Sequence, residues 1–479
     1  MNNKVGEVIT GYYGSWATYR SNLGKFEVSN INVDLCTHLI YTFAGIDSEG
    51  TIISLDPQLD LPDGNDNFRK FTSLKKQNPN LKTMLAVGGW NEGSAKYSIM
   101  AASPTFRNNF ITSTIDVLQK FDFDGLDIDW EYPNHRDSVN GQADINNFSQ
   151  LLKELREEFD KHGFILSAAV SAVKSSASQS YDIPIIIQYL DFVNIMAYDF
   201  YGSWDAVTGH NAQLRKGQGD ENIPRDAINS IDVALEYWLG QGCPPEKIVL
   251  GLPTYGHTFE LSNANNNGVR APSNGPGIAG PYTATRGVMG YNEFCEKQQT
   301  ENWEVHYDNL AKVPYAIQGT NWFSYDDADS FAAKIEYSLQ YNISGFMVWS
   351  IETDDFHGTC GESYPLLKSI NTALGKPVIS SSSLTPPLTS TTASTTSAST
   401  SIITTSSIPS TTLETPEETT ICKDEGLTGN PNDCTSFYMC IKDVNGELIP
   451  KSFQCPGNLY WDQVTWACNY PDQTICNLA

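Results

Sequence analysis

The sequence predicts an α/β fold for most of the chain, followed by a small cysteine-rich module. Short β-branched or apolar runs alternate with longer segments of helical periodicity, as a βαβα succession requires. Six of the ten cysteines lie in the last 58 residues. Between the two parts, 31 of the 45 residues from 376 to 420 are Ser, Thr or Pro. A chain of 479 residues is therefore expected to hold one large domain, a linker and a small module.

Eight segments of the large domain have the length and composition of strands. They are residues 8–13, 38–43, 82–87, 123–130, 164–170, 192–197, 248–252 and 345–350. Helical periodicity is plainest in residues 106–121, 144–162 and 328–341. The connection after the seventh strand, residues 256–319, is too long for a structureless loop in a compact domain, so we expect it to have structure of its own.

Charge and hydropathy exclude some classes of partner. The net charge of −26 argues against binding to nucleic acid or to an anionic membrane surface, because both select basic patches. No stretch approaches the roughly 18 consecutive apolar residues of a membrane span. The first residues, MNNKVGEVITGYYG, lack the apolar core of a signal peptide. The cysteine density at the other end suits an oxidising compartment, so we expect a secreted, extracellular protein whose leader is removed or not recorded.

The fourth predicted strand carries three acids on every second residue. In the stretch FDGLDIDWEY these acids are Asp127, Asp129 and Glu131, which share one face of a strand. Such a face is often the wet side of an amphipathic strand. Here the carboxylates are spaced about 6.5 to 7 Å apart, and no Lys or Arg lies between them. Crowding of this kind raises at least one carboxyl pKa, which catalysis by a carboxylic acid near neutral pH requires.

The motif D-x-x-D-x-D-x-E, formed by Asp124 and these three acids, resembles the signature of family 18 glycoside hydrolases, the chitinases and their relatives. The resemblance implies a (β/α)8 TIM barrel over residues 1–375, with a small α+β insertion at about 256–319. It also implies that Glu131 lies at the C-terminal mouth of the barrel, where the active sites of such barrels are found.

Other strand ends resemble family positions that line the sugar-binding cleft. Two glycines in AVGGW let a ligand or a helix approach the backbone closely, and an aromatic-lined groove suits a chain of pyranose rings. Phe43 fits ordinary barrel core about as well as a sugar contact. The candidate substrate-binding residues are Tyr12, Phe43, Gly89, Trp90, Met196, Asp199, Trp204, Tyr255 and Trp349. His257 stands where family members commonly have Arg.

The resemblance also implies a mechanism that uses the substrate as nucleophile. Glu131 would protonate the glycosidic oxygen, Asp129 would orient the acetamido nitrogen, and Tyr198 would bind the acetamido oxygen. Asp127 would share a proton with Asp129. We expect a monomer that acts on chitin and chito-oligosaccharides without metal or organic cofactor. The alternatives are an inactive chitin-binding lectin, disfavoured because Glu131 is present, and an endo-β-N-acetylglucosaminidase.

The module at residues 421–479 is too small to be stable without covalent cross-links. It lacks C-x2-C pairs and His, which argues against zinc. Its cysteine spacing is similar to that of peritrophin-type chitin-binding domains, which implies Cys422–Cys440, Cys434–Cys476 and Cys455–Cys468 pairs. Tyr460, Trp461 and Trp466 are its candidate sugar contacts. The Ser/Thr/Pro-rich linker at 376–420 reads as extended and O-glycosylated.

Four cysteines belong to the large domain. Cys295 and Cys360 match a family disulfide. Cys36 matches a half-cystine whose usual partner position is occupied here by Gly11. We therefore expect Cys36 to be unpaired and buried, and Cys243 to be free as well.

Overall fold

The computed structural model describes residues 5–377, 426–430, 433–442, 447–455, 460–462 and 467–469. The chain divides into two compact units, Met1–Thr385 and Pro386–Ala479, which are described separately. Most of the predicted linker, together with Cys422, Trp466 and Cys476, lies outside the described residues.

The first unit is a closed barrel of eight parallel strands, because β1 pairs with both β15 and β2. The barrel strands are β1 (Val8–Gly14), β2 (His38–Ile46), β4 (Lys82–Gly88), β5 (Gly125–Asp129), β6 (Ile165–Ser171), β7 (Phe192–Met196), β8 (Ile248–Pro253) and β15 (Gly345–Trp349). A short strand, β3 (Ile52–Ser54), adds antiparallel to β2. Each predicted strand overlaps an observed one, and the predicted (β/α)8 barrel is confirmed.

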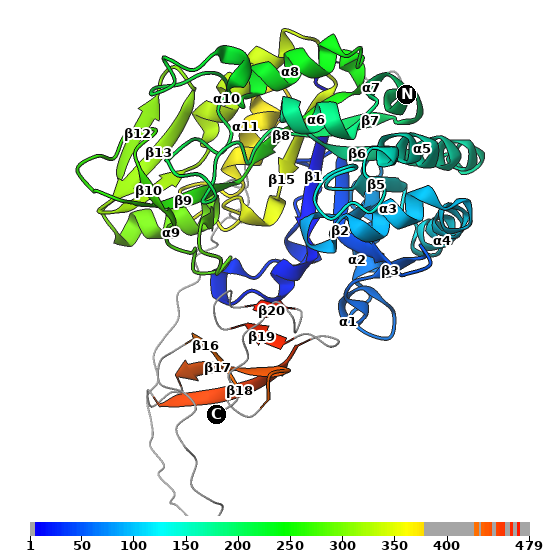
Figure 1. Cartoon of the computed structure of the whole chain (residues 1–479), viewed down its shortest axis with the longest axis horizontal. Helices are drawn as coiled ribbons and strands as arrows, with labels where there is room; N and C mark the ends of the chain where they lie inside the picture. The colour runs from blue at the N-terminus through cyan, green and yellow to red at the C-terminus, as the bar shows by residue number, and fades with distance from the viewer. Residues whose placement is uncertain are drawn as a thin grey trace, which may run out of the picture. The chain divides into compact units, whose positions relative to one another are not determined.

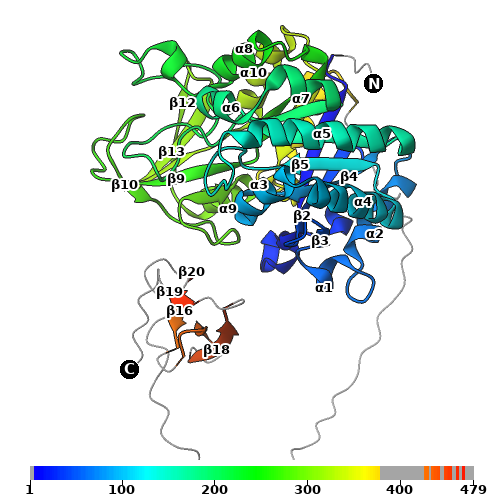
Figure 2. The same cartoon turned by 45° about the vertical axis from the view of Figure 1, so that its right-hand side comes forward.

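Helices surround the barrel, and α4 and α5 run side by side along one flank (Figures 1 and 2). The helices are α1 (Pro57–Asp60), α2 (Asn67–Thr72), α3 (Ala95–Ala102), α4 (Pro104–Phe121), α5 (Ala143–His162), α6 (Lys174–Ser180), α7 (Ile183–Tyr189), α8 (Ile231–Gly240), α9 (Tyr291–Thr300), α10 (Ala328–Leu339) and α11 (Pro365–Ala373). Local signals set the ends of α4. Pro104 opens it, Ser103 Oγ accepts a hydrogen bond from the Phe106 amide, and Asp122 ends it in the left-handed conformation.

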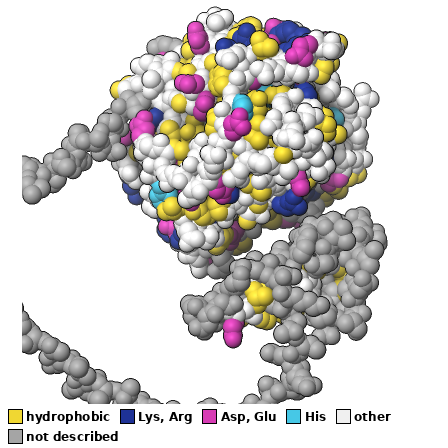
Figure 3. All heavy atoms as spheres, turned by 90° about the vertical axis from the view of Figure 1, so that its left-hand side faces the viewer, with side chains coloured by type: hydrophobic (Ala, Val, Ile, Leu, Met, Phe, Trp, Pro, Cys, Tyr) yellow, Lys and Arg dark blue, Asp and Glu magenta, His cyan; other side chains and the backbone are white. Residues whose placement is uncertain are grey.

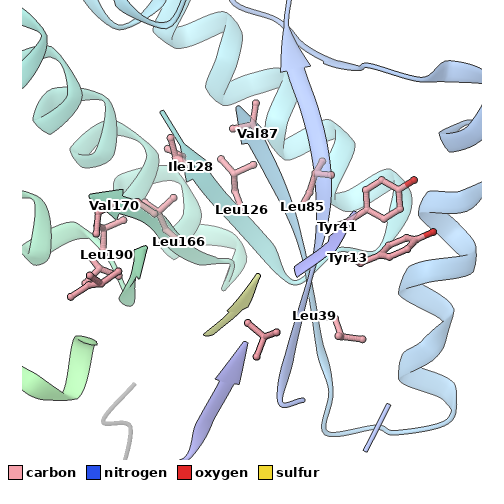
Figure 4. Close-up of a cluster of buried hydrophobic side chains, with 14 of the residues drawn as sticks. Tyr13, Leu39, Tyr41, Leu85, Val87, Leu126, Ile128, Leu166, Val170 and Leu190 are labelled. Carbon is pink, nitrogen blue, oxygen red and sulfur yellow. The ribbon is translucent and has the colours of Figure 1, made fainter. Parts of the chain in front are cut away.

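The alternation along each strand separates two apolar cores. Side chains such as Val8, Met84 and Met347 fill the barrel interior. Their neighbours in sequence point outward and pack beneath the helices, as Leu126 and Ile128 of β5 do in Figure 4. The inward positions of β5 are therefore left to Asp127 and Asp129.

The long connection after β8 forms an antiparallel sheet with one helix. It contains β9 (Tyr255–Leu261), β10 (Ser273–Pro276), β11 (Val288–Gly290), α9, β12 (Glu304–Asp308), β13 (Val313–Gln318) and β14 (Asn321–Ser324). These strands gather on one side of the barrel in Figure 1. A disulfide joins Cys295 of α9 to Cys360, as the resemblance implied.

Cys36 and Cys243 are both free and buried, which confirms the prediction. A Cβ atom added to Gly11 would lie 2.7 Å from Cys36 Sγ, so position 11 is indeed adjacent to this thiol. Burial raises the pKa of both thiols to about 12, which keeps them protonated and unreactive.

The second unit contains a three-stranded sheet, β16 (Gly426–Gly429), β17 (Ser436–Lys442) and β18 (Leu448–Gln454), and a hairpin, β19 (Tyr460–Asp462) and β20 (Ala467–Asn469). Cys434, Cys440 and Cys455 are disulfide-bonded. Their predicted partners have side chains outside the described part, so the pairing stays a prediction. Trp461 is buried and stacks on Phe437 with ring centroids 4.1 Å apart. It therefore packs in the core of the module, whereas Tyr460 is half-buried. The assignment of both residues as sugar contacts stays a prediction.

None of the helices described is long and apolar enough to cross a membrane. On the face of the insertion, acidic and basic side chains are scattered among other groups without a large basic patch (Figure 3). This distribution agrees with the acidic composition of the chain.

Candidate active site

The C-terminal mouth of the barrel holds a cavity of about 490 Å³. Its lining comes from the ends of all strands of the barrel except β8, and from the loops that follow them. The lining residues are Tyr12, Ser15, Trp16, Phe43, Leu55, Asp56, Asp60, Gly88, Trp90, Asn91, Glu92, Asp129, Glu131, Ala169, Met196, Tyr198, Asp199 and Trp349. Nine of the predicted site residues are among them: Tyr12, Phe43, Trp90, Asp129, Glu131, Met196, Tyr198, Asp199 and Trp349.

Glu131 lies two residues beyond β5 and is half-buried in the cavity wall. Burial raises the pKa of its carboxyl to about 7, and the negative charge of Asp199 contributes in the same direction. Hydrogen bonding to Tyr132 and the charge of Arg136 oppose the shift. A carboxyl group with this pKa keeps a substantial protonated fraction near neutral pH, so Glu131 has the property of a general acid.

Asp127 lies beneath the cavity floor and is fully buried. Its carboxylate accepts hydrogen bonds from Ser167 Oγ at 2.5 Å, Tyr12 Oη at 2.7 Å and Asn194 Nδ2 at 3.1 Å. These donors come from β6, β1 and β7, so Asp127 ties three strands together. Burial raises the pKa of Asp127, while the three donors counteract that rise.

Asp129 is buried one layer above Asp127 and lines the cavity. Its Oδ1 atom has no hydrogen-bond partner within the described residues. Burial first, then the charges of Glu131 and Asp127, raise the pKa of Asp129 well above its usual range. Among the residues that the structure describes, no hydrogen bond joins Asp129 to Asp127, whose oxygens accept from donors of three other strands. The free Asp129 oxygen is an acceptor suited to an N–H group of a ligand.

The end of β7 supplies Tyr198 and Asp199. Tyr198 Oη contacts Met347 Sδ at 3.6 Å, and its ring lies 6.0 Å from that of Tyr255. Tyr255 is buried and does not line the cavity, but its hydroxyl donates to Asp199 Oδ1 at 2.5 Å. The structure therefore gives Tyr255 a supporting position behind Asp199.

His257 also contacts Asp199, with Nε2 lying 2.7 Å from Oδ1. The ring of Trp204 packs against His257 with centroids 5.0 Å apart. Trp204 is 62% exposed and lies outside the cavity lining. It is therefore available to a ligand that extends beyond the cavity.

Aromatic rings form a continuous row along one wall. Trp349 and Phe43 are stacked with centroids 5.7 Å apart, and Phe43 and Trp16 are stacked at 6.1 Å. Tyr12 lies 5.5 Å from Trp349. Trp16, which is 41% exposed, was not predicted from the sequence; it follows β1 in a 3-10 turn (Ser15–Tyr19), where no strand alternation assigns its direction.

Trp90 and the two preceding glycines form the rim after β4. A Cβ atom on Gly89 would lie 2.7 Å from the Phe43 ring, so Gly89 allows close packing rather than lining the cavity itself. Trp90 lines the cavity and is 57% exposed. It therefore offers a second aromatic surface, separate from the row that contains Trp349.

One potential metal-ligand group occurs in the described part of the chain: Cys295, Asp355 and Cys360. Both cysteines are joined in a disulfide, so their sulfurs are not available to an ion. None of the three residues lines the cavity.

A barrel whose mouth combines a partly protonated carboxyl, a buried acceptor and rows of aromatic rings has the features of a carbohydrate-active enzyme. The chain belongs to the glycosyl hydrolases family 18, whose model matches residues 8–354. Residues 422–476 match the chitin-binding Peritrophin-A domain.

Relatives support both assignments. Probable chitinase 2 of Drosophila melanogaster is 40% identical over 400 residues, covering 77% of this chain and 80% of that protein. Chitotriosidase-1 of Mus musculus is 36% identical over 473 residues, covering 96% and 94%. The crystal structure of Ostrinia furnacalis Group IV chitinase has 55% sequence identity and a TM-score of 0.76, covering 77% of this chain and all of that one. Human YKL-39, described as a pseudo-chitinase that retains chitooligosaccharide binding, has 36% identity and a TM-score of 0.70, with 77% and 100% covered.

Proposed function

We propose that the protein is a chitinase that hydrolyses β-1,4 bonds between N-acetylglucosamine units with retention of configuration. The observation that carries this proposal is Glu131, a carboxyl at the barrel mouth whose pKa is raised to about 7 by burial and by Asp199. Most retaining glycosidases use a second carboxylate as nucleophile, whereas family 18 enzymes use the substrate. Asp129, which is buried with one unpaired oxygen, suits the accessory role.

In the proposed reaction, Glu131 donates its proton to the glycosidic oxygen as the bond to the anomeric carbon breaks. The acetamido oxygen of the sugar on the glycone side attacks that carbon and forms an oxazolinium ion. Asp129 accepts a hydrogen bond from the acetamido nitrogen and balances the positive charge that develops there. Water then opens the ring with Glu131 as base, which restores the acid and retains the configuration.

The other residues of the cavity have positioning roles in this proposal. Tyr198 donates to the acetamido oxygen, and Trp349 provides an apolar surface beneath the reacting sugar. Asp127 holds Tyr12 and the floor of the site through hydrogen bonds. Asp127 also acts on Asp129 through its negative charge, which raises the pKa of Asp129.

We propose that the barrel domain spans residues 1–375 and is joined by the linker at 376–420 to a chitin-binding module at 421–479. Such a module keeps the cleft near an immobile substrate and raises its effective concentration. The disulfide-rich module also suits secretion. We expect the protein to act as a monomer on extracellular chitin.

Two alternative functions remain distinct from this proposal. A chitin-binding lectin is favoured by the similarity to a pseudo-chitinase, but lectins of this family lack the terminal acid that Glu131 supplies here. An endo-β-N-acetylglucosaminidase would use the same barrel on glycoprotein glycans. The chitin-binding module argues for chitin as the substrate.

The test is to incubate the purified protein with colloidal chitin, with chitohexaose and with a high-mannose glycoprotein. The proposal predicts soluble chito-oligomers from the first two and no glycan release from the third. Binding to chitin without products would identify a lectin, and glycan release without chitin cleavage would identify the endoglycosidase.

A further inference from the structure

We propose that Arg136, which lies outside the cavity lining, is a positioning residue that holds the Trp90 ring in place as a sugar platform. This inference rests on the proposed function for the identity of the ligand. It adds to that function a residue that affects sugar binding through Trp90.

Arg136 holds Trp90 at two points. Its guanidinium carbon lies 3.7 Å from the centroid of the indole ring, within the distance of a strong cation–π contact. The same guanidinium donates from Nη1 to the Trp90 carbonyl oxygen at 2.7 Å. The guanidinium covers one face of the exposed ring. Arg136 therefore fixes the orientation of the ring and of the face that remains exposed.

The loop that carries Arg136 is fixed to the segment that follows Trp90. The Asp137 carboxylate accepts hydrogen bonds from the Ser94 amide at 2.9 Å and the Ala95 amide at 3.2 Å. Further along, Asn140 Nδ2 donates to the Ser98 carbonyl oxygen at 2.8 Å. These bonds do not involve Arg136, so the loop should keep its place when the guanidinium is removed.

The backbone of Arg136 gives independent support. Its φ angle is +56°, a left-handed conformation that costs free energy for a residue with a long side chain and that Gly or Asn adopts more readily. Local backbone stability therefore does not explain why an arginine is found at this position, whereas its contact with Trp90 explains it.

Arg136 also reaches the segment of the catalytic acid, since Nη1 lies 3.4 Å from the Glu131 carbonyl oxygen. A change at Arg136 can therefore act through Trp90 or through the charge felt by Glu131. The two routes differ in their measurable effects. Loss of the platform weakens sugar binding, whereas loss of charge moves the pH dependence of turnover.

The experiment is a double-mutant cycle in the full-length protein with Arg136→Asn, Trp90→Ala and the double variant. Asn suits the left-handed backbone, so the variant should fold. We expect Arg136→Asn to raise KM for chitohexaose about three- to tenfold with kcat changed less than twofold. In the Trp90→Ala background, the same change should have less than a twofold effect. Arg136→Lys keeps the charge but not the planar stack, so it should restore the pH profile and not KM.

Arg69→Gln is the matched control, because Arg69 makes an exposed cation–π contact with Phe121 on the outer layer of the barrel. It should leave KM and kcat unchanged. The affinity of each variant for chitohexaose, measured by calorimetry in the Glu131→Gln background, repeats the cycle without turnover. Equal effects of Arg136→Asn with and without Trp90, or an unchanged KM in an active enzyme, would overturn the inference. An inactive wild type would instead contradict the proposed function. The calorimetric cycle would still test whether Arg136 holds Trp90 in place for sugar binding.

Discussion

Asp199 Oδ1 and His257 Nε2 lie 2.7 Å apart at the rim of the cavity. The other ring nitrogen, Nδ1, lies 3.1 Å from the Gly287 carbonyl oxygen. The Tyr255 hydroxyl donates to the same Asp199 oxygen at 2.5 Å. His257 and Tyr255 therefore both contact Asp199 Oδ1 and fix the position of this carboxylate.

We therefore predict that a side chain able to hydrogen-bond Asp199 is needed at position 257. His257→Gln keeps this capacity and should keep kcat/KM for chitohexaose within about threefold, whereas His257→Leu should lower it about tenfold, the value of one lost hydrogen bond. Steady-state kinetics of the two variants provide the comparison. Equal activity of the Leu variant and the wild type would show that the contact at position 257 is not used.

A second prediction concerns the pH dependence of hydrolysis. Glu131 must be protonated to act as the acid, so kcat/KM should fall as the pH rises through about 7, the value to which burial and Asp199 raise its pKa. In Asp199→Asn, the charge that opposes ionisation of Glu131 is lost, and the alkaline limb should move to lower pH. A limb that stays in place or moves upward would exclude this coupling.

The two aspartates of β5 should differ in their contributions. Asp129→Asn should reduce kcat on chitohexaose at least a hundredfold, because the acetamido group loses its orienting carboxylate and counter-charge. Asp127→Asn should reduce kcat less, but it should lower the melting temperature more, because its amide cannot accept from all three buried donors. Thermal unfolding and single-turnover kinetics separate the two effects, with Tyr12→Phe as a variant that removes only one donor.

The chitin-binding module should matter only for insoluble substrate. A chain ending at residue 375 should hydrolyse chitohexaose at a near-normal rate and should lose most of its activity on insoluble chitin, because tethering raises local concentration without altering the chemistry. Equal losses on both substrates would indicate that the module is required for folding of the barrel.

The strands could be predicted because the pattern of each strand is local, whereas the closed barrel was implied by the resemblance to family 18 glycoside hydrolases. Alternation in residues 123–130 assigns Asp127 and Asp129 to the inside and Leu126 and Ile128 to the outside, and the structure has that arrangement. The length of residues 256–319 predicted that this connection has structure of its own. Its sheet extends slightly further, from Tyr255 at the start of β9 to Ser324 at the end of β14.

Contacts between distant segments were not predictable in the same way. Ser167 and Asn194 bind Asp127, but each is a polar residue on a mostly apolar strand, and nothing local shows what it contacts. Trp16 lies in a turn whose direction depends on the packing of its neighbours. In the small module, aromatic residues serve both as core and as surface, and only the structure shows that Trp461 is stacked on Phe437.

The most direct test is the turnover of Glu131→Gln on chitohexaose, with binding measured on the same preparation. Gln keeps the size and hydrogen-bonding capacity of Glu but cannot donate the proton, and general acid catalysis typically supplies about 10² to 10⁴-fold. We predict that hydrolysis nearly vanishes while affinity for chitohexaose stays within a few fold of the wild type. A variant free of contaminating enzyme that retained more than about a tenth of wild-type turnover would contradict the assignment of Glu131 as the acid, and with it the substrate-assisted mechanism.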